Sequence, residues 1–260
     1  IFFLFNVMPA DPAKMMLGDR DNQKQIELIN KKYHFDKPLF TQYMLYLNDL
    51  SFISFHSDKP LYKSYINILS VNNTSIILKR PYLRTSFYQK NTPVSFLIAS
   101  AFPNTIVLAL TAILFSLFFA IPLGIISAYF KDSILDRSIS LFSILGMSLP
   151  SFLSAVLISF VFAYKFGGIT NLNMTGSLFV IDDFGAGEIL NLKNLLLPAI
   201  TLGVRPLAVI IHLTRNSLIE QLSEDYVLLA RSKGFSILYV IIFHVLRNSM
   251  SSVVTAASGW

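Results

Sequence analysis

Of the 260 residues, 53% are hydrophobic and only 14% are charged, whereas about 25% of an average soluble protein is charged. This composition argues against an ordinary soluble domain and indicates a membrane protein. The net charge is +6, and the absence of cysteine excludes disulfide frameworks, thiolate metal sites and cysteine nucleophiles. The basic excess lies in residues 1–95, which hold 12 Lys and Arg against 7 Asp and Glu, so charge and apolar mass occupy different parts of the chain.

The first 100 residues predict the end of a membrane helix followed by a long extramembrane loop. Residues 1–5 are apolar, and we interpret residues 1–9 as the truncated end of a first span. A signal peptide would need a basic segment before this stretch and a small-residue cleavage pattern after it, and neither is present in the sequence. Residues 10–100 are polar, basic and tyrosine-rich, with a short helix favoured by the spacing of Leu39, Tyr43 and Leu47.

Four further spans are predicted in residues 101–260. The runs 91–130 and 138–164 contain no charged residue and exceed the roughly 20 residues that cross a bilayer. We therefore expect spans near 102–129 and 139–163, and two more that contain internal basic residues, near 194–215 and 237–260. Because residues 251–260 continue an apolar helical pattern with no closing charge, we expect the sequence to stop inside a membrane helix.

The short connections between these spans predict the orientation. Residues 131–137 and 215–233 together hold five Lys and Arg, whereas residues 165–193 hold two together with three acids. Basic residues in short loops favour the cytoplasmic side, and loops longer than roughly 60 residues escape this rule. We therefore expect the first two connections to be cytoplasmic and the N-terminal loop to lie outside.

Two features inside the spans point to packing and to a pathway. Small residues recur every four positions from Ser116 to Ala128 and predict a surface for close helix packing. Arg205 lies about ten residues into its span, where an arginine costs roughly 2.5 to 3.5 kcal/mol and usually faces a cavity or a partner. A translocation pathway is one interpretation, and snorkelling to the interface is the other.

Residues 223–234 carry the start and stop signals of a short cytoplasmic helix. Ser223 is positioned to cap it, and Gly234 supplies the left-handed residue that ends it. Acids occupy the predicted first turn and bases the last, as the helix dipole favours. Its apolar face, formed by Leu222, Tyr226, Leu229 and Ala230, suits either the bilayer surface or a groove in a soluble partner.

The stretch EDYVLLARSKGFSILYVIIFHVLRN, residues 224–248, closely resembles the cytoplasmic coupling loop, or EAA loop, of binding-protein-dependent ABC importer permeases. The match is to the dipeptide, oligopeptide and nickel branch, and within it to the first of two permease subunits. Further similar stretches occur in family order at residues 8–12, 35–39, 102–105, 121–124, 135–137, 148–152 and 197–199. Residues 51–81 depart from the family pattern and resemble an insertion.

The resemblance implies an all-α, polytopic membrane helix bundle of the type I importer kind, with a long extracytoplasmic loop after the first helix. It implies a heterodimer with a second permease, two ABC ATPase subunits and an extracytoplasmic solute-binding protein, in a bacterial inner membrane with lipid around it and no nucleic acid. The expected coupling loop is 216–236. The expected ATPase-coupling residues are Glu224, Asp225, Tyr226, Leu229, Ala230, Arg231, Lys233 and Gly234.

No catalytic residue, metal site or cofactor is expected, and the sequence contains no GxxxxGK[ST] phosphate loop. The favoured function is therefore a permease that moves short peptides while partner subunits hydrolyse ATP. A permease for nickel or another small solute shares the loop pattern and stays open. A stand-alone channel or secondary transporter is less favoured, because the predicted spans contain no Asp or Glu.

Overall fold

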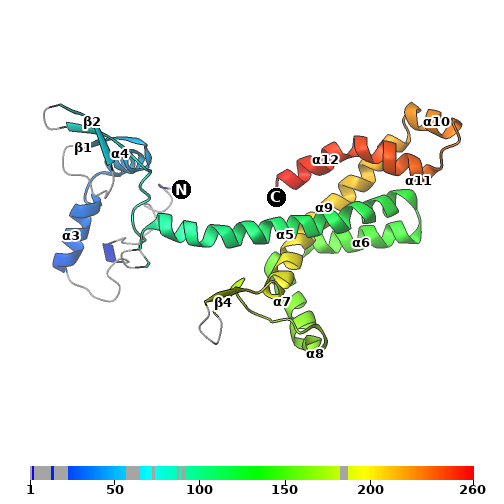
Figure 1. The fold of residues 1–260 in the computed structure, drawn as a ribbon, viewed down its shortest axis with the longest axis horizontal. Coiled ribbons are helices and arrows are strands. Elements are labelled where there is room, and N and C mark those ends of the chain that lie inside the picture. Colours follow the sequence, from blue (N-terminus) through cyan, green and yellow to red (C-terminus); the bar gives the residue numbers. More distant parts are fainter. Residues whose placement is uncertain are drawn as a thin grey trace. The chain divides into compact units, whose positions relative to one another are not determined.

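The computed structural model describes residues 2, 13–14, 23–56, 65–71, 74–86, 88–89, 92–181 and 187–260. The chain divides into two compact units, Ile1–Phe102 and Pro103–Trp260, each held together by its own contacts (Figure 1). The predicted end of a first span, residues 1–9, lies outside the described residues except for Phe2. The Phe2 ring stacks on Tyr46, with ring centroids 5.3 Å apart.

Among the described residues of the first unit, helices α3 (Gln23–Tyr33) and α4 (Leu39–Leu50) precede the strands. Helix α4 covers the segment in which apolar spacing predicts a helix, and it begins directly after Pro38. A proline favours an extended residue before it, so the helix starts here. The Gln42 amide holds this start in place by donating to the carbonyl oxygens of Phe35 at 3.0 Å and Lys37 at 2.8 Å.

The prediction of an all-α chain is wrong for the first unit, which contains a three-stranded antiparallel sheet. Strands β1 (Ile53–His56), β2 (Tyr65–Val71) and β3 (Thr74–Lys79) pair in the order β1-β3-β2. These strands make up most of the apparent insertion, residues 51–81. Each strand is too short to be stable alone, so the strands are stabilised by pairing with one another.

The second unit is mostly helical. It comprises α5 (Val94–Tyr129), which begins in the first unit, α6 (Ile134–Ser148), α7 (Ser151–Ser159), the π-helix η1 (Phe160–Lys165), α8 (Gly167–Thr170), β4 (Phe179–Ile181), β5 (Glu188–Leu190), α9 (Lys193–Leu222), α10 (Asp225–Ser232), α11 (Ile237–Val240), the π-helix η2 (Ile241–Val245) and α12 (Leu246–Ser258). Strands β4 and β5 pair antiparallel. Prolines lie inside both α5 and α9 without ending either helix, as packed membrane helices permit.

Three helical segments in the described part of the chain are long and apolar enough to cross a membrane: Val94–Tyr129, Lys193–Leu222 and Ile237–Ser258. The segment expected to form one span near 139–163 is not a single straight helix. Instead Ile134–Ser148 and Ser151–Lys165 meet at an angle of 110°. Leu149 and Pro150 are both extended at this break, with ψ of 130° and 139°. A residue before proline disfavours the helical conformation, which explains where the break falls.

The small-residue stripe of α5 packs against α9, as its spacing predicts. Ser116, Ala120 and Ala128 are at most 3% exposed. The Ser116 hydroxyl donates to the carbonyl oxygen of Gly203 at 2.7 Å. A Cβ atom on Gly124 would lie 2.6 Å from Cβ of Thr214, so the two helices approach closely only because this position has no side chain.

Candidate functional site

Helix α10 joins the end of α9 to α11 and begins one residue later than its sequence signals suggest. The prediction that Ser223 caps it is wrong, because this hydroxyl donates to the carbonyl oxygen of Glu220 at 2.6 Å and belongs to the end of α9. Glu224 is instead the extended residue before the helix, and it makes no side-chain capping bond. The expected end is confirmed, since Gly234 has a φ of +90° after Lys233.

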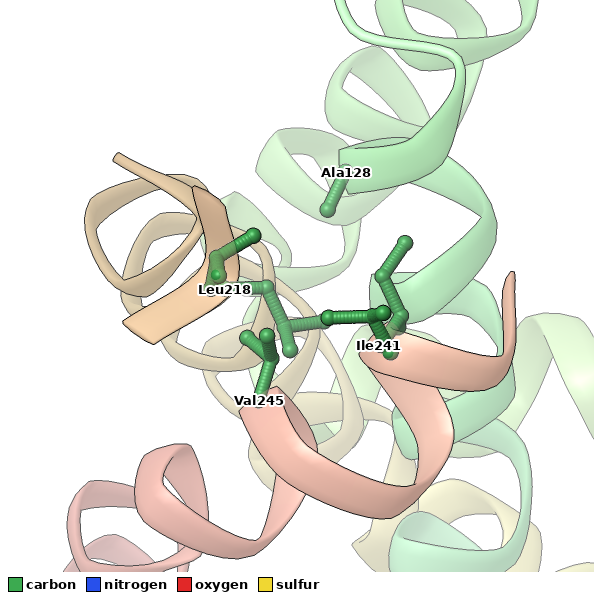
Figure 2. Packing of buried hydrophobic residues seen from close by; sticks show 6 residues of the cluster. Ala128, Leu218, Ile241 and Val245 are labelled. Carbon is green, nitrogen blue, oxygen red and sulfur yellow. The ribbon is translucent and has the colours of Figure 1, made fainter. Parts of the chain in front are cut away.

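One face of α10 is anchored in an apolar cluster formed with four other elements. Val227 is 3% exposed and packs in this cluster with side chains from α5, α9, α11 and η2 (Figure 2). The remaining buried members of the cluster are Ala128, Leu218, Val240, Ile241 and Val245. Because α10 shares this core with the end of α9 and the start of η2, these elements form one packed body.

The apolar face expected to meet a partner is divided between two environments. Leu222, Tyr226 and Ala230 pack against the cluster around Val227. Leu229 instead is 59% exposed, and its neighbour Leu228 is 69% exposed. The expectation of one continuous docking face is therefore corrected: the outward apolar surface of α10 consists of these two leucines. The charged candidates Glu224, Asp225, Arg231 and Lys233 are exposed around them.

A buried carboxylate that the sequence patterns did not single out lies at the same end of this body, one residue along α5 and three along α9 from members of the cluster. Asp136, in the first turn of α6, is 3% exposed. It accepts hydrogen bonds from the Ser127 hydroxyl at 2.5 Å, the Asp132 backbone N–H at 2.9 Å, and Nε and Nη2 of Arg215 at 2.6 Å each. This carboxylate ties the end of α5, the start of α6 and the inner part of α9 together.

The signal for Asp136 in the sequence is weak. Ser133 caps α6 and accepts from the Asp136 backbone N–H at 3.3 Å, so the spacing Ser-x-x-Asp is that of a capping box. The Asp136 carboxylate, however, accepts from the backbone N–H of Asp132 and not from that of Ser133. That spacing predicts a helix start but not a buried ion pair. Arg215 lies 79 residues away in the sequence, and only the fold brings the two together.

Arg205 lies in the middle part of α9 and lines a cavity of about 390 Å³. The walls of this cavity come from α5, the break between α6 and α7, α9 and the last residues of α12. A second cavity of about 590 Å³ is lined by residues of α7, the loop after α8 and the start of α9. The two share Ser151, Thr201 and Leu202, so they are neighbours along α9.

In the first unit, charged groups gather where α4 meets the sheet. The Arg84 guanidinium pairs with the Asp49 carboxylate at 2.9 Å, and the Lys79 ammonium donates to the carbonyl oxygens of Asp49 and Ser51. Burial lowers the pKa of Lys79, and the nearby Asp49 carboxylate opposes this. Burial also lowers the pKa of His56 and raises the pKa of Tyr82. These groups fasten the sheet to the helix and do not form a catalytic arrangement.

Comparison with known protein families accounts for nearly the whole chain. Residues 120–258 match the family described as "Binding-protein-dependent transport system inner membrane component". Residues 1–109 match the corresponding N-terminal family. The chain belongs to this family of transport permeases. The resemblance predicted from the coupling loop is thus confirmed, and the protein is a membrane transport component and not an enzyme.

Individual relatives are similar over almost the full chain. The oligopeptide transport system permease protein AppB of Bacillus subtilis is 27% identical over 98% of this chain and 70% of its own length. The probable D,D-dipeptide transport system permease protein DdpB of Escherichia coli is 30% identical over 98% and 70%. The dipeptide transport system permease protein DppB of Lactococcus lactis is 30% identical over 98% and 69%.

Proposed function

We propose that this permease is one membrane subunit of an ATP-driven importer of short peptides in a bacterial cytoplasmic membrane. In this proposal it pairs with a second permease, receives peptides from an extracytoplasmic binding protein, and is driven by two ATPase subunits that bind α10. The names of the relatives support peptides as the cargo, since they specify oligopeptides and dipeptides. These names favour peptides over the nickel alternative.

The coupling role is supported by the different environments of the two faces of α10. Its inner face shares a core with α9 and η2 through Val227, while Leu228 and Leu229 are exposed on the other side. A partner that bound the two leucines and moved would therefore move the inner ends of membrane helices with it. An apolar helix face docked in a groove is a common mode of recognition.

The test is a charge placed on the outward face alone. Leu229→Glu puts a carboxylate where the proposal expects an apolar ATPase groove, and burying an unpaired charge is costly. We expect peptide uptake by the reconstituted transporter to fall at least about tenfold, with ATPase subunits lost when the permease is purified. Ala230→Glu is a poorer test, because Ala230 packs on the permease's own core.

The matched control is Ile134→Glu. Ile134 is 83% exposed at the start of α6, in the other connection predicted to be cytoplasmic, and lies outside α10. We expect this variant to retain uptake and ATPase binding. Normal uptake in a well-expressed Leu229→Glu permease would reject the assignment of α10 as the coupling helix.

A further inference from the structure

Arg205 is an exposed positive charge in the middle of α9, a helix long and apolar enough to cross a membrane. None of the ion pairs within the described residues involves it; these pairs are Arg84 with Asp49 and Arg215 with Asp136. Among the described residues, no Asp or Glu lines either of the two cavities beside α9. An arginine in the middle of a membrane helix normally faces a cavity or a partner that repays its desolvation.

The two neighbouring cavities beside α9 are both lined by polar groups. Asn173, Thr175 and Asn194 line the cavity at the start of α9, and Ser151 and Thr201 lie where the two cavities meet. Arg205 lines the cavity farther along α9. Hydrogen-bonding side chains in the outer part and a cation in the inner part suit a cargo that is polar and carries a negative charge.

We propose that Arg205 binds the carboxylate of the peptide cargo as it passes along α9. This inference rests on the proposed function, because it names the group of the peptide that the pathway recognises. The planar guanidinium binds a carboxylate through two parallel hydrogen bonds, which an ammonium group does not reproduce. The cavity volumes of about 390 and 590 Å³ lie in the roughly 300–1,000 Å³ range of small-molecule sites.

The experiment measures the maximal uptake rate in proteoliposomes that contain the complete transporter, with dialanine as the probe. Arg205→Gln removes the charge, and Arg205→Lys keeps the charge but not the planar guanidinium that makes two parallel hydrogen bonds. The control, Lys193→Gln, removes a charge from the exposed start of the same helix. We expect uptake to fall at least about tenfold for Arg205→Gln, which corresponds to one charge-assisted hydrogen bond. We expect a smaller fall for Arg205→Lys and no change for Lys193→Gln.

A second measurement identifies the carboxylate. Dialanine amide keeps its N-terminal ammonium group but lacks the C-terminal carboxylate. Its uptake should therefore be the same for the parent protein and Arg205→Gln. Because the chain has no cysteine, Arg205→Cys in a complex whose other subunits carry no cysteine can also be modified at this one position. A positively charged methanethiosulfonate reagent should restore dialanine uptake, and a negatively charged one should not.

Three results would overturn the inference. The first is unchanged dialanine uptake in Arg205→Gln, and the second is restoration by reagents of either charge. The third is a lower dissociation temperature of the two permeases in Arg205→Gln, which would show that Arg205 pairs with a carboxylate of the second subunit. Absence of ATP-dependent peptide uptake by the parent transporter would instead contradict the proposed function itself.

Discussion

Asp136 shows how a charge is kept buried beside the polar connection between α5 and α6. A carboxylate offers about four lone-pair sites, and in this structure four donors occupy them: Ser127, the backbone of Asp132, and two nitrogens of Arg215. Because every site is filled, the desolvation of the carboxylate is offset by charge-assisted hydrogen bonds. The side chain thus fixes the distance between the start of α6 and the inner part of α9.

This arrangement predicts a strong energetic coupling between Asp136 and Arg215. Removing either partner leaves the other charge buried, which costs about 3–5 kcal/mol for a fully buried pair. Arg215 is 20% exposed in its side chain, so we expect about 2–3 kcal/mol for Asp136→Asn and for Arg215→Met. The double variant should lose less free energy of unfolding than the two single variants lose together, with a coupling energy of about 1 kcal/mol or more. Unfolding in detergent micelles measures all three variants.

The control for this cycle is Asp132→Asn. Asp132 is exposed, and its backbone N–H, which is the group that binds Asp136, is unchanged by the substitution. We expect its free energy of unfolding to stay within about 0.5 kcal/mol of the parent. Additive effects of the Asp136 and Arg215 substitutions would show that the ion pair does not contribute to stability.

At the scale of elements, the long membrane helices were predictable and the breaks between them were not. The uncharged run 91–130 is long enough to specify α5 by itself. Prolines do not specify where a helix breaks, because Pro122 and Pro206 lie inside intact helices and Pro150 follows a 110° bend. Whether neighbouring helices satisfy the freed carbonyl groups decides the outcome, and that depends on tertiary packing.

Helix α10 was predicted in place but not in orientation. A hydroxyl before an acidic turn fits an N-cap, yet Ser223 bonds to the preceding turn of α9 and α10 starts at Asp225. The face that turns inward is then set by Val227 and its contacts with residues of distant segments. The pairing of Asp136 with Arg215 and that of β1 with β3 have the same origin, since each joins residues that are remote in the sequence.

The sheet of the first unit should weaken in mild acid. Burial lowers the pKa of His56 below its ordinary value of 6.5, the Asp49 carboxylate opposes this, and the positive charge of Lys79 adds to it. A histidine with a depressed pKa binds protons more readily when unfolded, so the sheet is fully stable above 6.5 and loses stability as the pH falls through the folded pKa. Because His56 is partly exposed, we expect a loss below about 1 kcal/mol.

Hydrogen exchange of the β1 and β3 amides measures this effect at about pH 7.5 and about pH 5.5, after correction for intrinsic rates. We expect faster exchange at the lower pH in the parent protein and a flatter dependence in His56→Gln. Equal acid sensitivity with and without the imidazole would assign the effect to other groups.

For the whole molecule, the bent pair α6 and α7–η1 decides how the permease is threaded through the membrane. If the pair crosses once, the connections 131–137 and 216–236 lie on one side, and the segment between α8 and α9 lies on the other. If the pair forms a re-entrant loop and returns, the segment before α9 joins residues 131–137 and the α10 region moves to the opposite side. Basic residues in 131–137 and 215–233 favour the first arrangement.

Single cysteines distinguish the two arrangements, because the chain has none of its own. Lys131→Cys and Ser177→Cys place thiols at exposed positions on either side of the bent pair. With a membrane-impermeant maleimide on intact spheroplasts, we expect Ser177→Cys to react and Lys131→Cys to react only after lysis. Protection of both positions in intact spheroplasts would mean that the pair is re-entrant, and α10 would then lie outside, where no ATPase could bind it.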